Sequence, residues 1–226
     1  NNLPQVAFNA ESIVVLELQF CKLESLRNNV TLSSLRKLCS SHVYEDDQVI
    51  EDFVAGCPLI EYMHVFDCGG LKCLELPDLN NLKEFKAYDN FRLQRLHING
   101  VNVCSIDLAS RRTLSDINVA PCKHLEKLKL SGLYIIDECP SNQVSKLQFL
   151  EYLHIDCCMK LRSAKISSRC LKKLFFKGEF MLDTSNLSTF EYQGNLVSFS
   201  SNALALSQII LFLSTVISLT SISTRD

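Results

Sequence analysis

An eleven-residue pattern of apolar residues recurs along this chain and constrains its fold more than any other feature. The pattern places apolar residues at positions 1, 4, 6 and 11 and a cysteine or asparagine at position 9, and it runs from about Ile13 to about Leu196. Four nearly complete copies begin at Ile13, Ile60, Leu114 and Leu150, with Cys21, Cys68, Cys122 and Cys158 at the cysteine position. A single unit of this kind cannot bury its own apolar edge, so successive units are expected to stack into a solenoid.

The spacing of weaker copies predicts two strands in each turn of the solenoid. Between Ile60 and Leu125 the copies begin at 60, 71, 82, 93, 103, 114 and 125, a step of 10 or 11 residues. The pattern is the leucine-rich-repeat consensus, which normally has about 20–29 residues per coil and one strand. The half-length step therefore predicts coils of about 22 residues with parallel strands on both faces. One sheet is expected near Leu16, Leu38, Met63, Phe85, Ile106, Leu128, Leu153 and Leu174, and the other near Leu74, Leu96, Ile117, Ala164 and Phe190.

One return between strands has a helical pattern. Apolar residues recur at helical spacing from Val49 to Val54, acidic residues at 46 and 47 suit the start of a helix, and Gly56 suits its end. The polar stretch Asp137–Lys146 predicts a loop with a short helix. The expected fold class is thus α/β leaning to all-β: a leucine-rich-repeat solenoid of 11-residue half-repeats with one or two short helices. We expect residues 1–200 to form this solenoid and residues 201–226 a separate apolar segment.

Because side chains alternate along a strand, the residues between the inward leucines face solvent. On the first sheet this predicts an outward face about 30–40 Å long. Its aromatic content indicates a protein-binding surface, although aromatic pairs on a sheet also arise from cross-strand packing. The candidate binding residues are Tyr62, His64, Phe66, Lys86, Tyr88, Lys129, Tyr152, His154, Asp156 and Phe175.

Composition argues against several other functions. A formal net charge of −2 provides no basic surface for nucleic acid. The eleven cysteines are odd in number and scattered, which favours reduced thiols in the cytosol or nucleus. There is no C-x-x-C pair for a metal, no glycine-rich phosphate loop, and no nucleophile placed at a predicted helix N-terminus. We therefore expect a chain without catalytic residues, cofactor or metal.

The last stretch of the chain has two interpretations. Ala203–Ile222 is uncharged and long enough to cross a bilayer, but it contains Gln208 and several Ser and Thr residues, and no basic cluster flanks it. The alternative to a membrane anchor is an apolar segment that covers the end of the solenoid.

The order of motifs resembles plant F-box/leucine-rich-repeat proteins, including those with a C-terminal FBD segment. The resemblance rests on Ser12–Leu23 (SIVVLELQFCKL), on the strand, acidic helix and GCPLIE turn within Leu32–Leu76, and on Phe199–Ser207 (FSSNALALS). It implies the target-binding region of a substrate receptor in a cullin–RING ubiquitin ligase, in which an F-box would bind a Skp-type adaptor. No F-box lies ahead of these repeats in the sequence, which begins at Asn1, so we expect a fragment of a longer protein.

The target protein is unknown from the sequence, and other classes stay open. One is a free-standing or membrane-tethered repeat protein, such as a truncated paralogue or decoy. Another is an immune-receptor-type repeat domain, although the 24-residue repeat with an L-x-G-x-I-P return that is usual there is missing.

Overall fold

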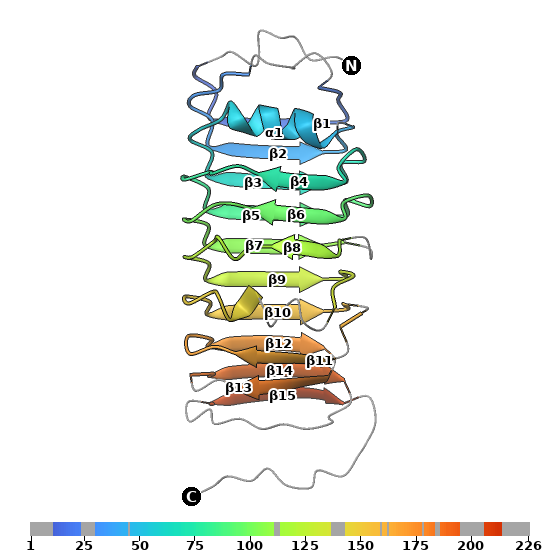
Figure 1. Cartoon of the computed structure of the whole chain (residues 1–226), viewed down its shortest axis with the longest axis vertical. Helices are drawn as coiled ribbons and strands as arrows, with labels where there is room; N and C mark the ends of the chain where they lie inside the picture. The colour runs from blue at the N-terminus through green and yellow to red at the C-terminus, as the bar shows by residue number, and fades with distance from the viewer. Residues whose placement is uncertain are drawn as a thin grey trace, which may run out of the picture.

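The computed structural model describes residues 11–23, 30–44, 46–110, 114–136, 143–158, 160–161, 163–177, 179–183, 186–194 and 206–213. In this part the chain forms an elongated solenoid in which strands stack one upon another along the long axis, from β1 at one end to β15 at the other (Figure 1). The repeat therefore builds the solenoid that the sequence predicts.

One side of the solenoid is a ten-stranded parallel sheet, here called the large sheet. Its register follows the repeat: Tyr62 pairs with Glu84, and Glu84 with Ser105, so neighbouring strands are one coil of 21 or 22 residues apart. In spatial order its strands are β1 (Val15–Gln19), β2 (Lys37–Ser41), β3 (Tyr62–Phe66), β5 (Glu84–Tyr88), β7 (Ser105–Ala109), β9 (Lys127–Ser131), β10 (Tyr152–Asp156), β12 (Lys173–Lys177), β14 (Thr189–Gly194) and β15 (Gln208–Leu213).

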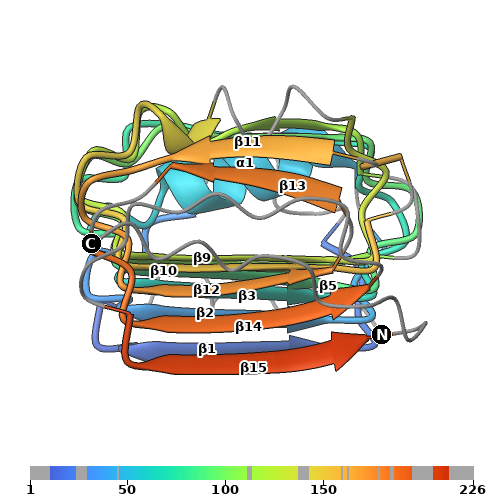
Figure 2. The ribbon, with the colours of Figure 1, turned by 90° about the horizontal axis from the view of Figure 1, so that it is seen from below.

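The opposite side carries shorter parallel strands, as the half-length step predicts. A three-stranded sheet contains β4 (Cys73–Leu76), β6 (Arg95–Ile98) and β8 (Asp116–Asn118), and a two-stranded sheet contains β11 (Ser163–Ser167) and β13 (Glu179–Asp183). Seen along the axis, the two sides form two layers (Figure 2). The core lies between them: leucines such as Leu74 and Leu96 from one side and Phe85 and Leu128 from the other are fully buried. Each coil thus buries its apolar edge against its neighbours.

The prediction for Phe190 was wrong. We expected it on the second side, but β14, which contains it, pairs with β12 in the large sheet. The cause is an additional strand, β13, which pairs with β11 and already supplies the second side of that coil. The coil is also short, since Lys173 pairs with Thr189 only 16 residues later. The sequence prediction had overlooked β13.

Helix α1 (Asp47–Ala55) confirms the predicted helical return. The Asp46 side chain accepts a hydrogen bond from the Val49 N–H at 3.1 Å, and Gly56 ends the helix. Carboxylates one helical turn apart, on Asp47 and Glu51, accept hydrogen bonds from the backbone N–H groups of Lys72 and Glu75 at 2.7 and 2.8 Å. The helix therefore satisfies backbone donors at the edge of β4 that would otherwise be open to another strand.

Two kinds of hydrogen bond join successive coils. At the entrance to each strand of the large sheet, one carbonyl accepts two N–H groups of the next coil; the Glu61 carbonyl, for example, accepts those of Lys83 and Glu84 at 2.8 and 3.1 Å. Inside the coil, buried Asn90 accepts the Cys68 N–H at 2.9 Å and donates to the Val65 carbonyl at 3.0 Å. These bonds fix the vertical register of the coils.

Cysteines occupy the same position as Asn90 in other coils, as the pattern predicts. The thiols of Cys68 and Cys122 lie 3.7 and 3.6 Å from the Ser40 and Ile98 carbonyls, and burial raises the pKa of both thiols to about 11. These cysteines are therefore packing residues of the solenoid.

Two predicted segments are described only in part. Of Asp137–Lys146, the first six residues lie outside the described residues, and Gln143 and Val144 are helical. Of Ala203–Ile222, residues 206–213 are described, and within them β15 forms the last strand of the large sheet. No helix in the described part of the chain has the length and apolarity needed to cross a bilayer.

Candidate functional site

The outward face of the large sheet, here called the large face, carries three rows of side chains that run along the solenoid. The first residues of the strands form one row, the middle residues a second and the last residues a third, because the strands pair in register. All ten candidate binding residues predicted from the sequence lie in these rows. Tyr62 and Phe66, at the two ends of β3, are 39% and 38% exposed, while the other eight are half-buried.

Toward the C-terminal end of the large face, three candidate residues form a continuous stack. The rings of His154 and Phe175 are parallel with centroids 4.2 Å apart, and Tyr152 lies 6.5 Å on the other side of His154. The Lys127 ammonium lies 5.6 Å from the centre of the Tyr152 ring. Burial lowers the pKa of His154, so its imidazole is neutral and behaves as an aromatic ring at neutral pH.

The middle of the large face holds charged groups that are paired with one another. Glu84 lies 2.9 Å from both His64 Nε2 and Lys86 Nζ. Burial opposes ionisation of Glu84, but the hydrogen bonds from Lys86 and His64 outweigh it and lower its pKa. The network is internally compensated, so no excess of either charge remains here for a partner to neutralise.

A second network lies beside it, around Asp107. Lys129 is 3.6 Å from the Asp107 carboxylate. The pKa of Tyr88 is raised by burial and by the charge and hydrogen bond of Asp107. Tyr88 therefore stays a neutral phenol held by the carboxylate of the next coil, and it contributes a fixed ring edge to the large face.

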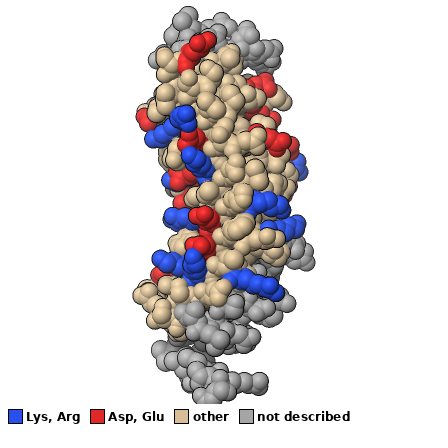
Figure 3. All heavy atoms as spheres, turned by 90° about the vertical axis from the view of Figure 1, so that its left-hand side faces the viewer, with Lys and Arg blue, Asp and Glu red and all other residues tan. Residues whose placement is uncertain are grey.

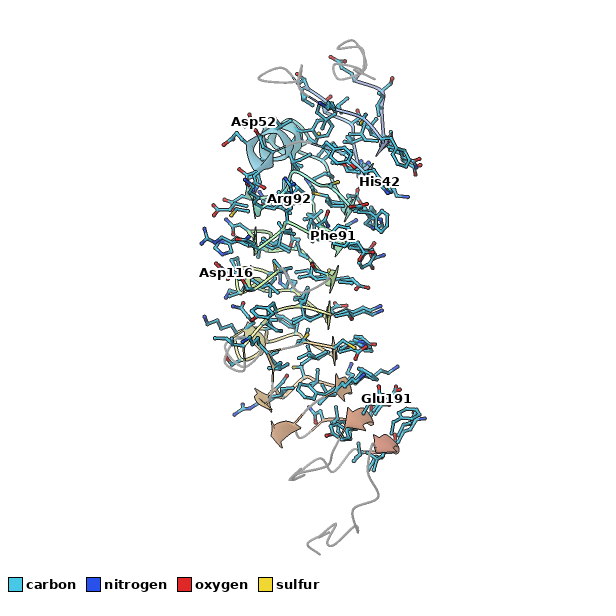
Figure 4. All side chains as sticks on the ribbon, turned by 90° about the vertical axis from the view of Figure 1, so that its right-hand side faces the viewer. His42, Asp52, Phe91, Arg92, Asp116 and Glu191 are labelled. Atoms are coloured by element: carbon cyan, nitrogen blue, oxygen red, sulfur yellow. The ribbon has the colours of Figure 1, made fainter. Side chains whose placement is uncertain are left out.

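Sequence reasoning missed a third cluster, at the edge where the chain leaves the large sheet. Phe20 stacks on His42 with ring centroids 4.4 Å apart, and His42 meets Phe66 edge-on at 5.4 Å. Phe20 and His42 follow strands β1 and β2 directly. The signal in the sequence was position: Phe20, Asp67 and Asp89 each come one residue before the Cys or Asn of the consensus. Figure 4 looks onto this side of the solenoid, with His42 at the edge of the large sheet.

The opposite side, where the chain enters the large sheet, is polar. Figure 3 shows acidic and basic side chains interleaved down this edge of the sheet. Glu61 pairs with Arg36 and, at 2.7 Å, with Lys83, and Lys172 lies 2.6 Å from Glu151. A shallow groove of about 460 Å³ lies on this side, lined by Glu61, Asn80, Asn81, Lys83, Asn102, Cys104, His124 and Glu126. Two of its asparagines already bond the carbonyls of Pro58 and Asn80, at 3.0 and 2.7 Å, which leaves few polar groups to hold a ligand.

The second side presents a smaller polar surface. Arg95 bonds the Asp116 carboxylate at 2.9 Å, and His97 lies 3.5 Å from the same group. Over the described ranges, no three His, Cys, Asp or Glu side chains converge as metal ligands would. The large face is therefore the surface with the most exposed aromatic residues in ordered rows.

Comparisons with known proteins agree with this geometry. Residues 6–119 match the family model described as At1g61320/AtMIF1, LRR domain. No curated protein and no solved structure matches the chain. The match covers the first five strands of the large sheet, including β3 with Tyr62 and Phe66.

Proposed function

Because the chain belongs to the leucine-rich-repeat domain family of At1g61320/AtMIF1, a family of plant protein-binding repeat domains, we propose that its large face holds a target protein for ubiquitination. Solenoids of this kind bind partners along their extended surfaces and are not themselves catalysts. The proposed role is recognition: the chain selects a target, and another subunit performs the chemistry.

The observation that carries the proposal is the pair of aromatic groups on the large face. Tyr62 and Phe66 lie on β3, and the stack of Tyr152, His154 and Phe175 lies on β10 and β12. Four strand spacings separate β3 from β10, which corresponds to about 19 Å. Aromatic residues dominate the energetics of protein interfaces, and paired charges between them contribute register more than affinity.

The finer role is that of the substrate-recognition region of an F-box subunit in a cullin–RING ligase. Its support is the resemblance in motif order, from Ser12–Leu23 through the acidic helix and GCPLIE turn to Phe199–Ser207. We propose that a Skp-type adaptor joins the full-length protein to the ligase, and that the complex acts in the cytosol or nucleus. The repeat region then provides target selection alone.

The test uses the full-length gene product expressed in plant cells, in three forms. The first is wild type, and the second is the triple variant Tyr62→Ala, Phe66→Ala, Tyr152→Ala on the large face. The third is a matched control, Phe91→Ala, Tyr134→Ala, Phe149→Ala, which removes aromatic rings that are 43%, 39% and 52% exposed but lie on the turns. Adaptor binding and ubiquitination of co-purified proteins are measured for each form.

We expect all three forms to bind the adaptor equally, and the large-face variant alone to lose its targets and their ubiquitination. If the full-length protein binds no Skp-type adaptor, the ligase role is wrong. If the control variant loses the same targets as the large-face variant, the large face is not the recognition surface.

A further inference from the structure

The stack of Phe20, His42 and Phe66 costs the fold energy without adding to its core. Phe20 is 69% exposed, more than the other large apolar side chains of the described surface, and its φ of 51° is in the left-handed region. His42 has a φ of 54°. Bulky side chains rarely adopt this conformation, and exposed aromatic surface gains nothing from folding. A strained and exposed ring of this kind suggests a role in binding.

The stack is held rigidly. The Phe20 and His42 N–H groups bond the Ser41 and Phe66 carbonyls at 3.1 and 3.0 Å, which continues the ladder of the large sheet by one residue. The imidazole of His42 is fixed at both nitrogens, with Ser41 Oγ 2.8 Å from Nδ1 and the Asp67 carboxylate 3.4 Å from Nε2. A partner would therefore meet a preformed surface and pay little to order it.

Carboxylates surround this aromatic surface. Asp67 and Asp89 occupy the position of Phe20 and His42 in the next two coils, and Glu17 lies on β1 beside them. They outnumber Lys22, the basic residue on the turn that follows Phe20. The Asp67 carboxylate is directed at the stack through its contact with His42. The corner thus combines an open aromatic face with a negative local charge.

We propose that the corner formed by Phe20, His42, Phe66 and Asp67, the aromatic corner, binds an arginine side chain of the target. This deepens the proposed function and rests on it, since it assigns one contact of the same large face. A guanidinium can lie flat on an aromatic ring while its edge donates to a carboxylate, and a lysine ammonium cannot do both with the same geometry. A purely apolar side chain would leave the neighbouring carboxylates desolvated without a partner.

The probe is a short synthetic peptide with a single arginine, compared with two peptides that carry citrulline or lysine in its place. Citrulline keeps the shape of arginine and removes its charge. Binding to the chain is followed by the NMR signals of aromatic and imidazole rings, with Phe20→Ala and Asp67→Asn as variants. Phe149→Ala is the matched control, because Phe149 is also an exposed ring beside a histidine, His124, at 5.6 Å, but lies on the other turn.

We expect the arginine peptide to shift the ring signals of Phe20 and His42, and the citrulline peptide to bind about five-fold more weakly. Phe20→Ala and Asp67→Asn should each weaken arginine binding several-fold, and Phe149→Ala should leave it unchanged. Equal binding of the citrulline peptide, or shifts that fall away from the corner, would overturn the arginine site. If the arginine site fails while the large-face triple variant still loses its targets, the proposed function stands without it.

Discussion

Replacing Asn90 tests how the coils are held together. Its carboxamide is 2% exposed and bonds the Cys68 N–H and the Val65 carbonyl, both in the preceding coil. In Asn90→Ala both backbone groups stay buried and lose these partners. A buried polar group without a partner costs about 1–3 kcal/mol, so the two together should cost about 2–5 kcal/mol of the free energy of unfolding.

The chain offers graded variants at this position. Asn90→Cys introduces the residue that other coils use here, and we expect it to lose less stability than alanine, because a thiol fills the space and donates weakly. Asn90→Asp keeps the acceptor for Cys68 but cannot donate to Val65 and buries a charge, so it should be at least as damaging as alanine. The control is Asn81→Ala, which removes one exposed bond to the Pro58 carbonyl.

Urea unfolding followed by circular dichroism measures the effect. With a slope of about 2–3 kcal/mol per molar urea for a domain of this size, the midpoint of Asn90→Ala should fall by about 1–2 M. Asn81→Ala should move it by less than about 0.5 M. If Asn90→Ala unfolds at the same urea concentration as wild type, the reasoning that this amide joins the coils is refuted.

Three further predictions concern stability and thiol chemistry. Gly132→Ala should lose at least about 2 kcal/mol in urea unfolding, because φ is +68° there and a Cβ would lie 2.4 Å from the Ser110 carbonyl oxygen; unchanged stability would contradict this backbone geometry. Asp46→Ala should cost about 1 kcal/mol in the same assay through loss of the α1 cap, and Asp46→Asn, which keeps an acceptor, should cost less. Burial raises the pKa of Cys57 to about 12, above its unfolded value near 8.5, so its contribution to stability is intact below about pH 8.5 and is lost as pH rises toward 12. Iodoacetamide should accordingly label Cys57 in the unfolded chain but not in the folded chain at pH 8, and rapid labelling of folded protein would show that this thiol is not buried.

The repeat made most of the fold predictable. Period and consensus together place Leu74 and Leu96 on the second side and Phe85 and Leu128 in the large sheet, because each inward leucine has only one way to reach the core. The helix was predictable for a separate reason: Asp46 and Gly56 provide caps at both ends of an apolar helical pattern. Local chemistry and repeat periodicity agree in this region.

The C-terminal coils were less predictable. Phe190 matches the consensus for either side, and the choice depends on whether a strand intervenes after Lys177. Residues 179–183 form that strand, but EFMLD carries no consensus leucine pattern. Once the coil shortens to 16 residues, counting by 11 places every later residue on the wrong side.

The outward rows were predictable, but the contacts within them were not. Strand alternation alone places Tyr152, His154 and Phe175 on the large face. Their stacking depends on the register between β10 and β12, which pairs His154 with Phe175. Phe20 and His42 escaped detection because they lie one residue beyond the strand, where a left-handed residue turns its side chain back toward the large face.

The central claim is that the large face is the recognition surface, and quantitative mass spectrometry of co-precipitated proteins tests it most directly. Full-length wild type is compared with the variant Tyr62→Ala, Phe66→Ala, Tyr152→Ala and with the turn control Phe91→Ala, Tyr134→Ala, Phe149→Ala, at matched urea midpoints. We expect the bound target to fall at least about ten-fold in the large-face variant, as loss of aromatic anchors does at other interfaces, and to be unchanged in the control. Equal recovery of the target from wild type and the large-face variant would contradict the claim.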